Sequence, residues 1–354
     1  MNQVTLLRQT LQPHLRWHGA RLSFVALFLI ALFRVKTVNL SELATGFRGK
    51  ATQDAHYKRL QRFFRHFELD YYDFAHTVVS LMDIPEPWVL SIDRTQWQFG
   101  SVVFNILTLG IVHEGVAFPV LWWMLDKKGN SNTQERIELL DEWQQLFPQR
   151  QIQCLTADRE FMGEQWFEYL LKQTRMPFRI RIRESDKLSK GRTTGLKGKV
   201  VFAHLKPNEV QVLKNRRCLW GHWVYVAALK LEDGKLLIVA TAHAPKTAIS
   251  DYAHRWGIET LFGIFKTRGF CLESTHLQDV ERLSKLFALL TLALCWAFRT
   301  GQWLRQLKPL KLKKHGRRTK SIFRYGFDHL RGIVLNLDQR ADEFREVLPF
   351  LSCT

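Results

Sequence analysis

Two aspartates occupy equivalent places in the sequence, each directly after a short apolar run with the composition of a β-strand. Asp93 follows residues 89–92 and Asp158 follows residues 154–157. Acids at the ends of neighbouring central strands can converge on one point, and their oxygens are hard ligands that suit Mg²⁺ or Mn²⁺. Either aspartate alone is more often a turn or helix-cap residue. The pair therefore indicates a metal site only if a third element supports it.

The third element is a helical segment that carries Tyr252, Arg255, Glu259 and Lys266. At 100° per residue these four side chains fall within roughly a 60° arc, spread over about 21 Å of helix, while apolar residues occupy the opposite side. One face can thus pack on a sheet, and the other offers a carboxylate between cations that can hold phosphates. The alternative is a surface salt-bridge network of the Arg255–Glu259 kind, which leaves Tyr252 and Lys266 on the same face unexplained.

This spacing resembles the signature of a known family. The DDE transposases of bacterial insertion sequences, in their IS-four-type branch, are defined by Tyr, two residues, Arg, three residues, Glu, six residues and Lys, and residues 252–266 match every spacing. Residues 92–95 and 157–159 resemble the contexts of the first two acids in that family. The similarity covers roughly residues 40–300.

The resemblance implies a mechanism and a set of partners. It implies that Asp93, Asp158 and Glu259 bind two Mg²⁺ or Mn²⁺ ions, and that Tyr252, Arg255 and Lys266 contact phosphates. The expected activity is strand cleavage at transposon ends, followed by transfer of the 3′ hydroxyl into target DNA. The expected assembly is a homodimer on DNA, with no small-molecule cofactor. Relatives can stack a flipped base on a tryptophan of their β insertion; Trp220 and Trp223 are candidates here, although a place in the core of the insertion is the commoner role.

The fold class expected is α/β, and the resemblance implies a ribonuclease H-like core, a mixed sheet with helices on both faces. We expect an all-helical DNA-binding domain at 1–83, a catalytic domain at 84–304 with a β-rich insertion at about 184–234, and a basic segment with a C-terminal helix at 305–354. Core strands are expected at 88–93, 102–112, 116–125, 152–157, 178–183 and 236–240. Insertion strands are expected at 200–205, 210–213 and 220–231. Helices are expected at 133–147, 247–270 and 279–304.

Two basic segments are the predicted DNA contacts outside the site. A short helix from residue 40 ends at glycines, and a basic amphipathic helix follows at 55–67 with Arg59 and Arg62, an order that resembles a helix-turn-helix. A small helical bundle with a solvated basic face is the alternative.

The second basic segment, from Arg305 to Arg324, holds nine basic residues and no acidic ones, including Lys313, Lys314, Arg317 and Arg318. Such a run is either a solvated tether or a phosphate-contacting loop.

Composition and charge narrow the classes of function. The 354 residues carry a formal net charge of +19, which favours a polyanion as partner, nucleic acid before a membrane surface. Apolar runs at 22–33 and 286–298 have 12 and 13 residues, whereas a membrane span needs about 20. The polar first residues lead us to expect no secretory signal, and the five scattered cysteines form no disulfide or zinc pattern. We therefore expect a cytoplasmic protein, associated with the nucleoid when bound to DNA.

Two rival functions remain at this stage. One is a DNA-binding regulator that derives from a transposase but no longer cuts; the presence of all three acids argues against it. The other is a two-metal nuclease of the same fold, such as a repair enzyme or junction resolvase. The length, the β insertion and the basic tail disfavour the nuclease.

Overall fold

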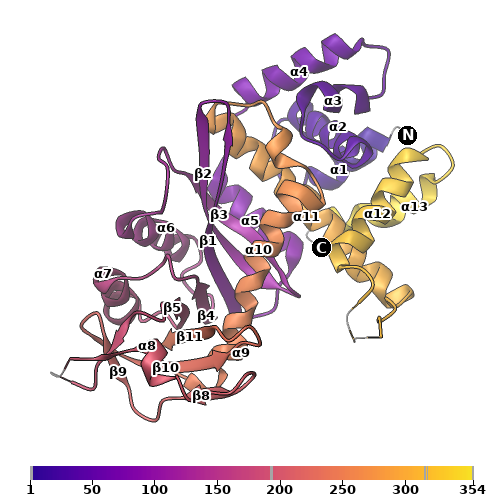
Figure 1. Ribbon diagram of the computed structural model, residues 1–354. Helices are drawn as coiled ribbons and strands as arrows, with labels where there is room; N and C mark the ends of the chain where they lie inside the picture. Colours follow the sequence, from indigo (N-terminus) through magenta and orange to yellow (C-terminus); the bar gives the residue numbers. More distant parts are fainter. Residues whose placement is uncertain (1–2, 192–193, 315, 317, 353–354) are drawn as a thin grey trace.

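A mixed β-sheet lies at the centre of the molecule, with helices on both of its faces (Figure 1). The computed structural model describes residues 3–191, 194–314, 316 and 318–352. The strands are β1 Trp88–Phe99, β2 Val102–His113, β3 Val116–Met124, β4 Ile152–Ala157, β5 Phe178–Ile182, β6 Lys187–Leu188, β7 Leu196–Lys197, β8 Val210–Val212, β9 Arg217–Leu219, β10 His222–Lys230 and β11 Leu236–Thr241. The helices are α1 Gln3–Leu11, α2 Gly19–Val35, α3 Leu40–Gly46, α4 Gln53–His66, α5 Tyr71–Met82, α6 Thr133–Leu146, α7 Glu164–Glu168, α8 Gly198–Val201, α9 Ala248–Tyr252, α10 Trp256–Gly263, α11 Val280–Leu307, α12 Ile322–Leu335 and α13 Ala341–Val347.

The strand order of the sheet is β3-β2-β1-β4-β5-β11-β10-β8, with β9 paired to β10 off this path. Strands β1, β4 and β5 run parallel, and the other pairings are antiparallel. Successive residues of β3 point to opposite faces: Trp122 donates its indole N–H to Ser284 on α11, and Trp123 donates to Glu142 on α6. Helices α6 and α11 therefore cover opposite faces of the sheet.

Strand β1 is longer than the sequence predicted. An end at Asp93 was expected, but β1 continues to Phe99 because the antiparallel neighbour β2 pairs with it from Val89 to Phe99. The parallel neighbour β4 pairs with β1 only as far as Ile92. Asp93 thus marks the point where β1 leaves β4, not the end of β1.

The segment predicted as one helix over 247–270 changes its winding several times. A 3₁₀ turn at Pro245–Thr247 leads into α9, a second 3₁₀ turn at Ala253–Arg255 separates α9 from α10, and a π-helical turn at Ile264–Arg268 follows. Helix α10 packs closely on the sheet: a Cβ on Gly257 would stand 2.7 Å from Val112 Cγ1. Such turns inside a helix often mark functional sites.

The predicted insertion at about 184–234 is not separate from the main sheet. Strand β10 pairs with β11, and β8 pairs with β10, so both extend the central sheet. The predicted strand at 200–205 is wrong: its first residues belong to the helical turn α8, since the structure gives this stretch no strand partner among the described residues and propensity alone does not make a strand.

Helices from the two ends of the chain, within 1–83 and 305–354, pack together (Figure 1). Phe33 on α2 packs against Phe327 on α12, with ring centroids 5.3 Å apart, and Arg34 donates to the Val334 carbonyl at 3.3 Å. Helix α12 crosses α11 in close backbone contact: a Cβ on Gly326 would lie 1.8 Å from the Ala297 carbonyl oxygen. Apolar residues at both chain ends thus share one core.

Helix α11 is the longest helix, with 28 residues, and by length and composition it could cross a membrane. The helix predicted at 279–304 corresponds to α11. The apolar part of α11 is longer than the 13-residue run at 286–298 indicated. Of its apolar window, 89% is buried inside the protein. A core helix satisfies the same criteria, and packing against α5, α12 and β3 accounts for the burial.

Candidate active site

Asp93 and Asp158 lie side by side at the edge where β1 and β4 separate. The last pair of the parallel ladder is Ile92 with Ala157, and each aspartate is the next residue along its strand. Each carboxylate accepts a hydrogen bond from the following backbone N–H, that of Arg94 at 2.7 Å and that of Arg159 at 2.6 Å. The convergence that the sequence predicted is thus a consequence of strand register.

Arg255 connects the third carboxylate to this pair. Its Nη1 lies 3.4 Å from Asp93 Oδ2, and its Nη2 donates to Glu259 Oε1. The Arg255 residue is 5% exposed, whereas the Glu259 side chain is 39% exposed. One buried guanidinium therefore holds Asp93 and Glu259 together, one from the sheet and one from α10.

Burial is the main electrostatic influence on Asp93. The pKa of Asp93 is raised to about 7, mainly by burial. The Arg94 N–H and the Arg255 cation oppose this rise, and the carboxylates of Asp158 and Glu160 add smaller contributions to it. Burial also raises the pKa of Tyr252 to about 12. A divalent cation at such a buried carboxylate would stabilise its ionised form.

The donor set fits a divalent cation in its chemistry, because Asp93 and Asp158 follow the last pair of neighbouring parallel strands and Arg255 links Glu259 to Asp93. A ready-made cage is not present: no three Asp, Glu, His or Cys side chains of the described residues stand close enough to hold an ion. The cation between Asp93 and Glu259 in this structure is Arg255.

The other two signature residues lie apart from each other. Tyr252 is 3% exposed, and the Arg255 guanidinium carbon lies 5.7 Å from the centre of its ring. Lys266 reaches β1, donating to the Gln96 carbonyl at 2.9 Å and pairing with Glu273 at 3.0 Å. The roles of Tyr252, Arg255 and Lys266 in phosphate binding stay predictions.

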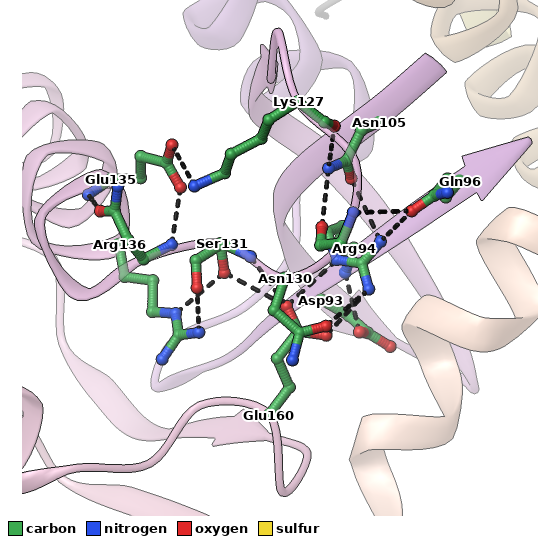
Figure 2. Close-up of polar contacts among 12 residues, drawn as sticks. Asp93, Arg94, Gln96, Asn105, Lys127, Asn130, Ser131, Glu135, Arg136 and Glu160 are labelled. Atoms are coloured by element: carbon green, nitrogen blue, oxygen red, sulfur yellow. Dashed lines mark hydrogen bonds and ion pairs between the residues drawn. The ribbon is translucent and has the colours of Figure 1, made fainter. Parts of the chain in front are cut away.

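Sequence reasoning missed a polar clasp beside the aspartates (Figure 2). Arg94 on β1 binds Glu160 with two hydrogen bonds, from Nε to Oε1 at 3.1 Å and from Nη2 to Oε2 at 3.2 Å. The same guanidinium donates to Gln96, Asn105 and Asn130. The clasp therefore joins β1, β2, the loop before α6 and the loop after β4.

The loop before α6 is held by the same clasp. Glu160 Oε1 accepts from the backbone N–H and the hydroxyl of Ser131, and Arg136 donates to that hydroxyl at 2.9 Å. Arg136 also stacks over the Phe161 ring, 4.8 Å from its centre. The available sequence signal was an arginine directly after each aspartate, but nothing local pairs Arg94 with a glutamate 66 residues away.

The predicted DNA-contacting residues outside the site lie on the surface. Arg59 and Arg62 are exposed on α4, which follows α3 as predicted. Lys313 and Lys314 are exposed in the loop between α11 and α12, where Leu312 pairs with Arg318; Arg317 lies outside the described residues. Their contact with DNA stays a prediction.

The tryptophan candidates of the insertion differ in exposure. Trp220 packs against Phe167, with ring centroids 5.0 Å apart, and Trp223 is 47% exposed. Cys154, Cys218 and Cys271 are free thiols, and Cys353 lies outside the described residues.

The family model described as "Transposase DDE domain" matches residues 87–296 of the chain. The chain belongs to the DDE transposase family. The match begins just before β1 and ends within α11, so it contains Asp93, Asp158 and Glu259. As a DDE transposase the protein is an enzyme of DNA transposition.

Among solved structures, the transposase is similar to a piggyBac transposase in a synaptic complex with hairpin DNA. The sequence identity is 11% and the TM-score is 0.49, and the similarity covers 95% of this chain and 77% of that one. No curated protein matches the sequence.

Proposed function

We propose that this transposase cuts DNA at the ends of a mobile element and joins the freed 3′ hydroxyl groups to target DNA. The observation that mainly supports this is the placement of the three acids: Asp93 and Asp158 are neighbours by strand register, and Arg255 links Glu259 to Asp93. The acids come from three elements that are distant in sequence, and all lie within the family match at 87–296. We also propose that the chain belongs to the IS-four-type branch of bacterial insertion sequences, on the spacing of residues 252–266.

The sheet order supports a ribonuclease H-like core. Strands β3, β2 and β1 form an antiparallel meander, and β4 and β5 continue parallel to β1. Parallel strands bring their carboxyl ends to one edge, which is where Asp93 and Asp158 lie. Helix α10 packs across the same part of the sheet and brings Glu259 to that edge.

The chain's own residues would prepare a phosphodiester for in-line attack. Asp93, Asp158 and Glu259 would hold the divalent cations, Mg²⁺ or Mn²⁺ and two per site, which supply charge neutralisation and activation of water or a 3′ hydroxyl. Arg255 orients two of the carboxylates, and the Arg94–Glu160 clasp fixes the segments that carry Asp93 and Asp158. No covalent protein–DNA bond is required, so Tyr252 has a positioning role.

We propose DNA as the partner, with the ends of the element and the target both bound by the basic surface that the net charge of +19 supplies. Joining two ends in concert requires two copies of the chain, so a homodimer on DNA is part of the proposal. A bacterial cytoplasm is the proposed location.

The test is a plasmid assay with purified full-length protein, Mg²⁺ or Mn²⁺, and a supercoiled substrate that carries the inverted repeats bordering the gene. We expect nicks at the repeat boundaries, and joining of labelled, precleaved ends to a second plasmid. A regulator would retard the plasmid in a gel without nicking it, and a nuclease would nick it without joining ends. Either outcome contradicts the proposal.

A further inference from the structure

A pocket of about 400 Å³ lies on the Asp158 side of the candidate active site and is lined by an unusual concentration of cations. Five basic side chains and one carboxylate, that of Glu184, line it. The basic residues are Arg159, Arg181, Arg183, Lys197 and Lys199. Arg159 directly follows Asp158, which places this wall of the pocket at the candidate site.

Strand β5 and the residue after it supply two of the arginines that line the pocket. From Phe178 to Arg183 the sequence alternates apolar residues with arginines, so Arg179, Arg181 and Arg183 lie on one face. Arg179 is 2% exposed and pairs with Asp251 of α9 at 2.8 Å. The other two arginines continue the row outward, with Arg181 half-buried and Arg183 exposed.

The cations that line the pocket differ from the other cations of the site in how their charge is balanced. Three carboxylates near the site pair with other cations: Glu160 with Arg94, Asp251 with Arg179 and Glu259 with Arg255. Asp158 accepts the Arg159 N–H and, among the described residues, forms no ion pair with the five cations of the pocket. Glu184 Oε1 accepts the Leu236 N–H at 3.0 Å, and Asp186 accepts the Arg183 N–H at 2.7 Å. Within the part of the chain that the structure describes, none of the five cations forms an ion pair.

A half-buried guanidinium without an anion lowers the stability of the fold, because it loses hydration and gains no counter-charge. Arginine is also the side chain whose planar donors fit a phosphate with two hydrogen bonds. The two flanking lysines extend the positive surface from β5 to the turn of α8. These features favour an anion from outside the chain as the partner of Arg181 and its neighbours.

We infer that this pocket binds the phosphodiester backbone of the duplex being cut, on the Asp158 side of the scissile phosphate. The inference rests on the proposed function for its ligand and goes beyond the signature residues, which lie on the other side of the acids: Lys266 reaches β1 at Gln96. The contact is to phosphates and does not depend on base sequence.

The experiment measures DNA affinity in the absence of divalent metal, so that no cleavage occurs. Fluorescence anisotropy with a terminal-repeat duplex and with an unrelated duplex of equal length gives the dissociation constant at several salt concentrations. The variant is Arg183→Gln/Lys199→Gln, both exposed residues. The matched control is Lys206→Gln/Lys214→Gln, which removes equal charge from exposed lysines of the same insertion outside the pocket.

We expect the pocket variant to bind both duplexes more weakly and to lower the magnitude of the slope of log K against log salt by about 2, near 1 for each lost phosphate contact. The control should keep the wild-type slope. Equal slopes in wild type and pocket variant, or equal losses in variant and control, would overturn the inference. Loss with the terminal repeat alone would overturn the phosphate assignment, since it would mean base reading.

The half-buried Arg181 gives a second test. Arg181→Gln should weaken DNA binding in the same way, and Arg181→Lys should restore part of it because the charge remains without the planar fork. Thermal unfolding shows whether Arg181→Gln or Arg181→Lys fails to fold. If either fails, the result of the Arg183→Gln/Lys199→Gln variant decides the test. Failure of the proposed function is separable: a wild type that never cuts or joins DNA contradicts that function, whereas the slopes test the pocket alone.

Discussion

The two aspartates and the glutamate of the candidate site are held by different kinds of structure. Asp93 and Asp158 follow the last pair of a parallel ladder, and a clasp of Arg94 and Glu160 joins their segments. Glu259 lies on a helix with a 3₁₀ turn before it and a π-helical turn after it, and Arg255 holds its half-exposed side chain. The sheet therefore fixes one half of the site, and a single guanidinium positions the other half.

The largest effect should come from removing a carboxylate from either half. Asp93→Ala, Asp158→Ala and Glu259→Ala should each reduce plasmid cleavage to background while binding of end DNA survives, because in the proposed function the acids hold cations and not the DNA duplex. Nicking of a supercoiled plasmid measures the loss, with Glu232→Ala as an exposed control. A mutant that cuts at near the wild-type rate would remove its residue from the triad.

The next effect should come from the link between the halves. Arg255→Gln should lower the cleavage rate by about 10- to 100-fold, the usual cost of losing a residue that orients ligands. Arg255→Lys should recover only part of this, since one ammonium cannot hold Asp93 and Glu259 with a planar fork. A wild-type rate in Arg255→Gln would mean that Glu259 reaches its position without the guanidinium.

The clasp on the sheet side should act mainly on stability. Arg94→Gln or Glu160→Gln should lower the free energy of unfolding by about 1.5–3 kcal/mol, because both side chains are mostly buried, at 14% and 16% exposed, and bond charge to charge. In a double-mutant cycle the two losses should be coupled by about 0.5–3 kcal/mol. The exposed pair of Lys172 and Glu168 is the control, with coupling near 0.5 kcal/mol or less. Additive losses at Arg94 and Glu160 would contradict the clasp.

The smallest effect is expected at Lys266, which lies at the far end of the helical half. Lys266→Ala should weaken assembly of the end complex more than metal binding, and should lower the slope of log K against log salt by about 1 if the ammonium contacts a phosphate. Lys172→Ala is the surface control. A loss of stability with an unchanged slope would show instead that Lys266 serves only its contacts with Gln96 and Glu273.

Local sequence patterns were sufficient to predict many of the strands and helices. Strands β2, β3 and β4, helix α6 and the α3–α4 pair lie where alternation, apolar spacing and turn residues predicted them. The predicted strand at 200–205 failed because β-branched residues favour a strand only where a partner strand exists. The continuous helix at 247–270 failed because the segment contains 3₁₀ and π-helical turns where it packs closely on the sheet.

The sequence by itself determined which residues are candidates for the chemistry: acids after apolar runs and a Tyr-Arg-Glu-Lys spacing are local features, and they persist in any fold that keeps those elements. Tertiary structure alone decided how the charges are balanced. Whether Arg255 meets Asp93, whether Arg94 meets Glu160, and whether Arg181 is left without a carboxylate depends on strand register and on loops brought together from distant parts of the chain. Coulomb energy depends on the distance between charges and on their burial, and neither quantity can be read from the order of the residues alone.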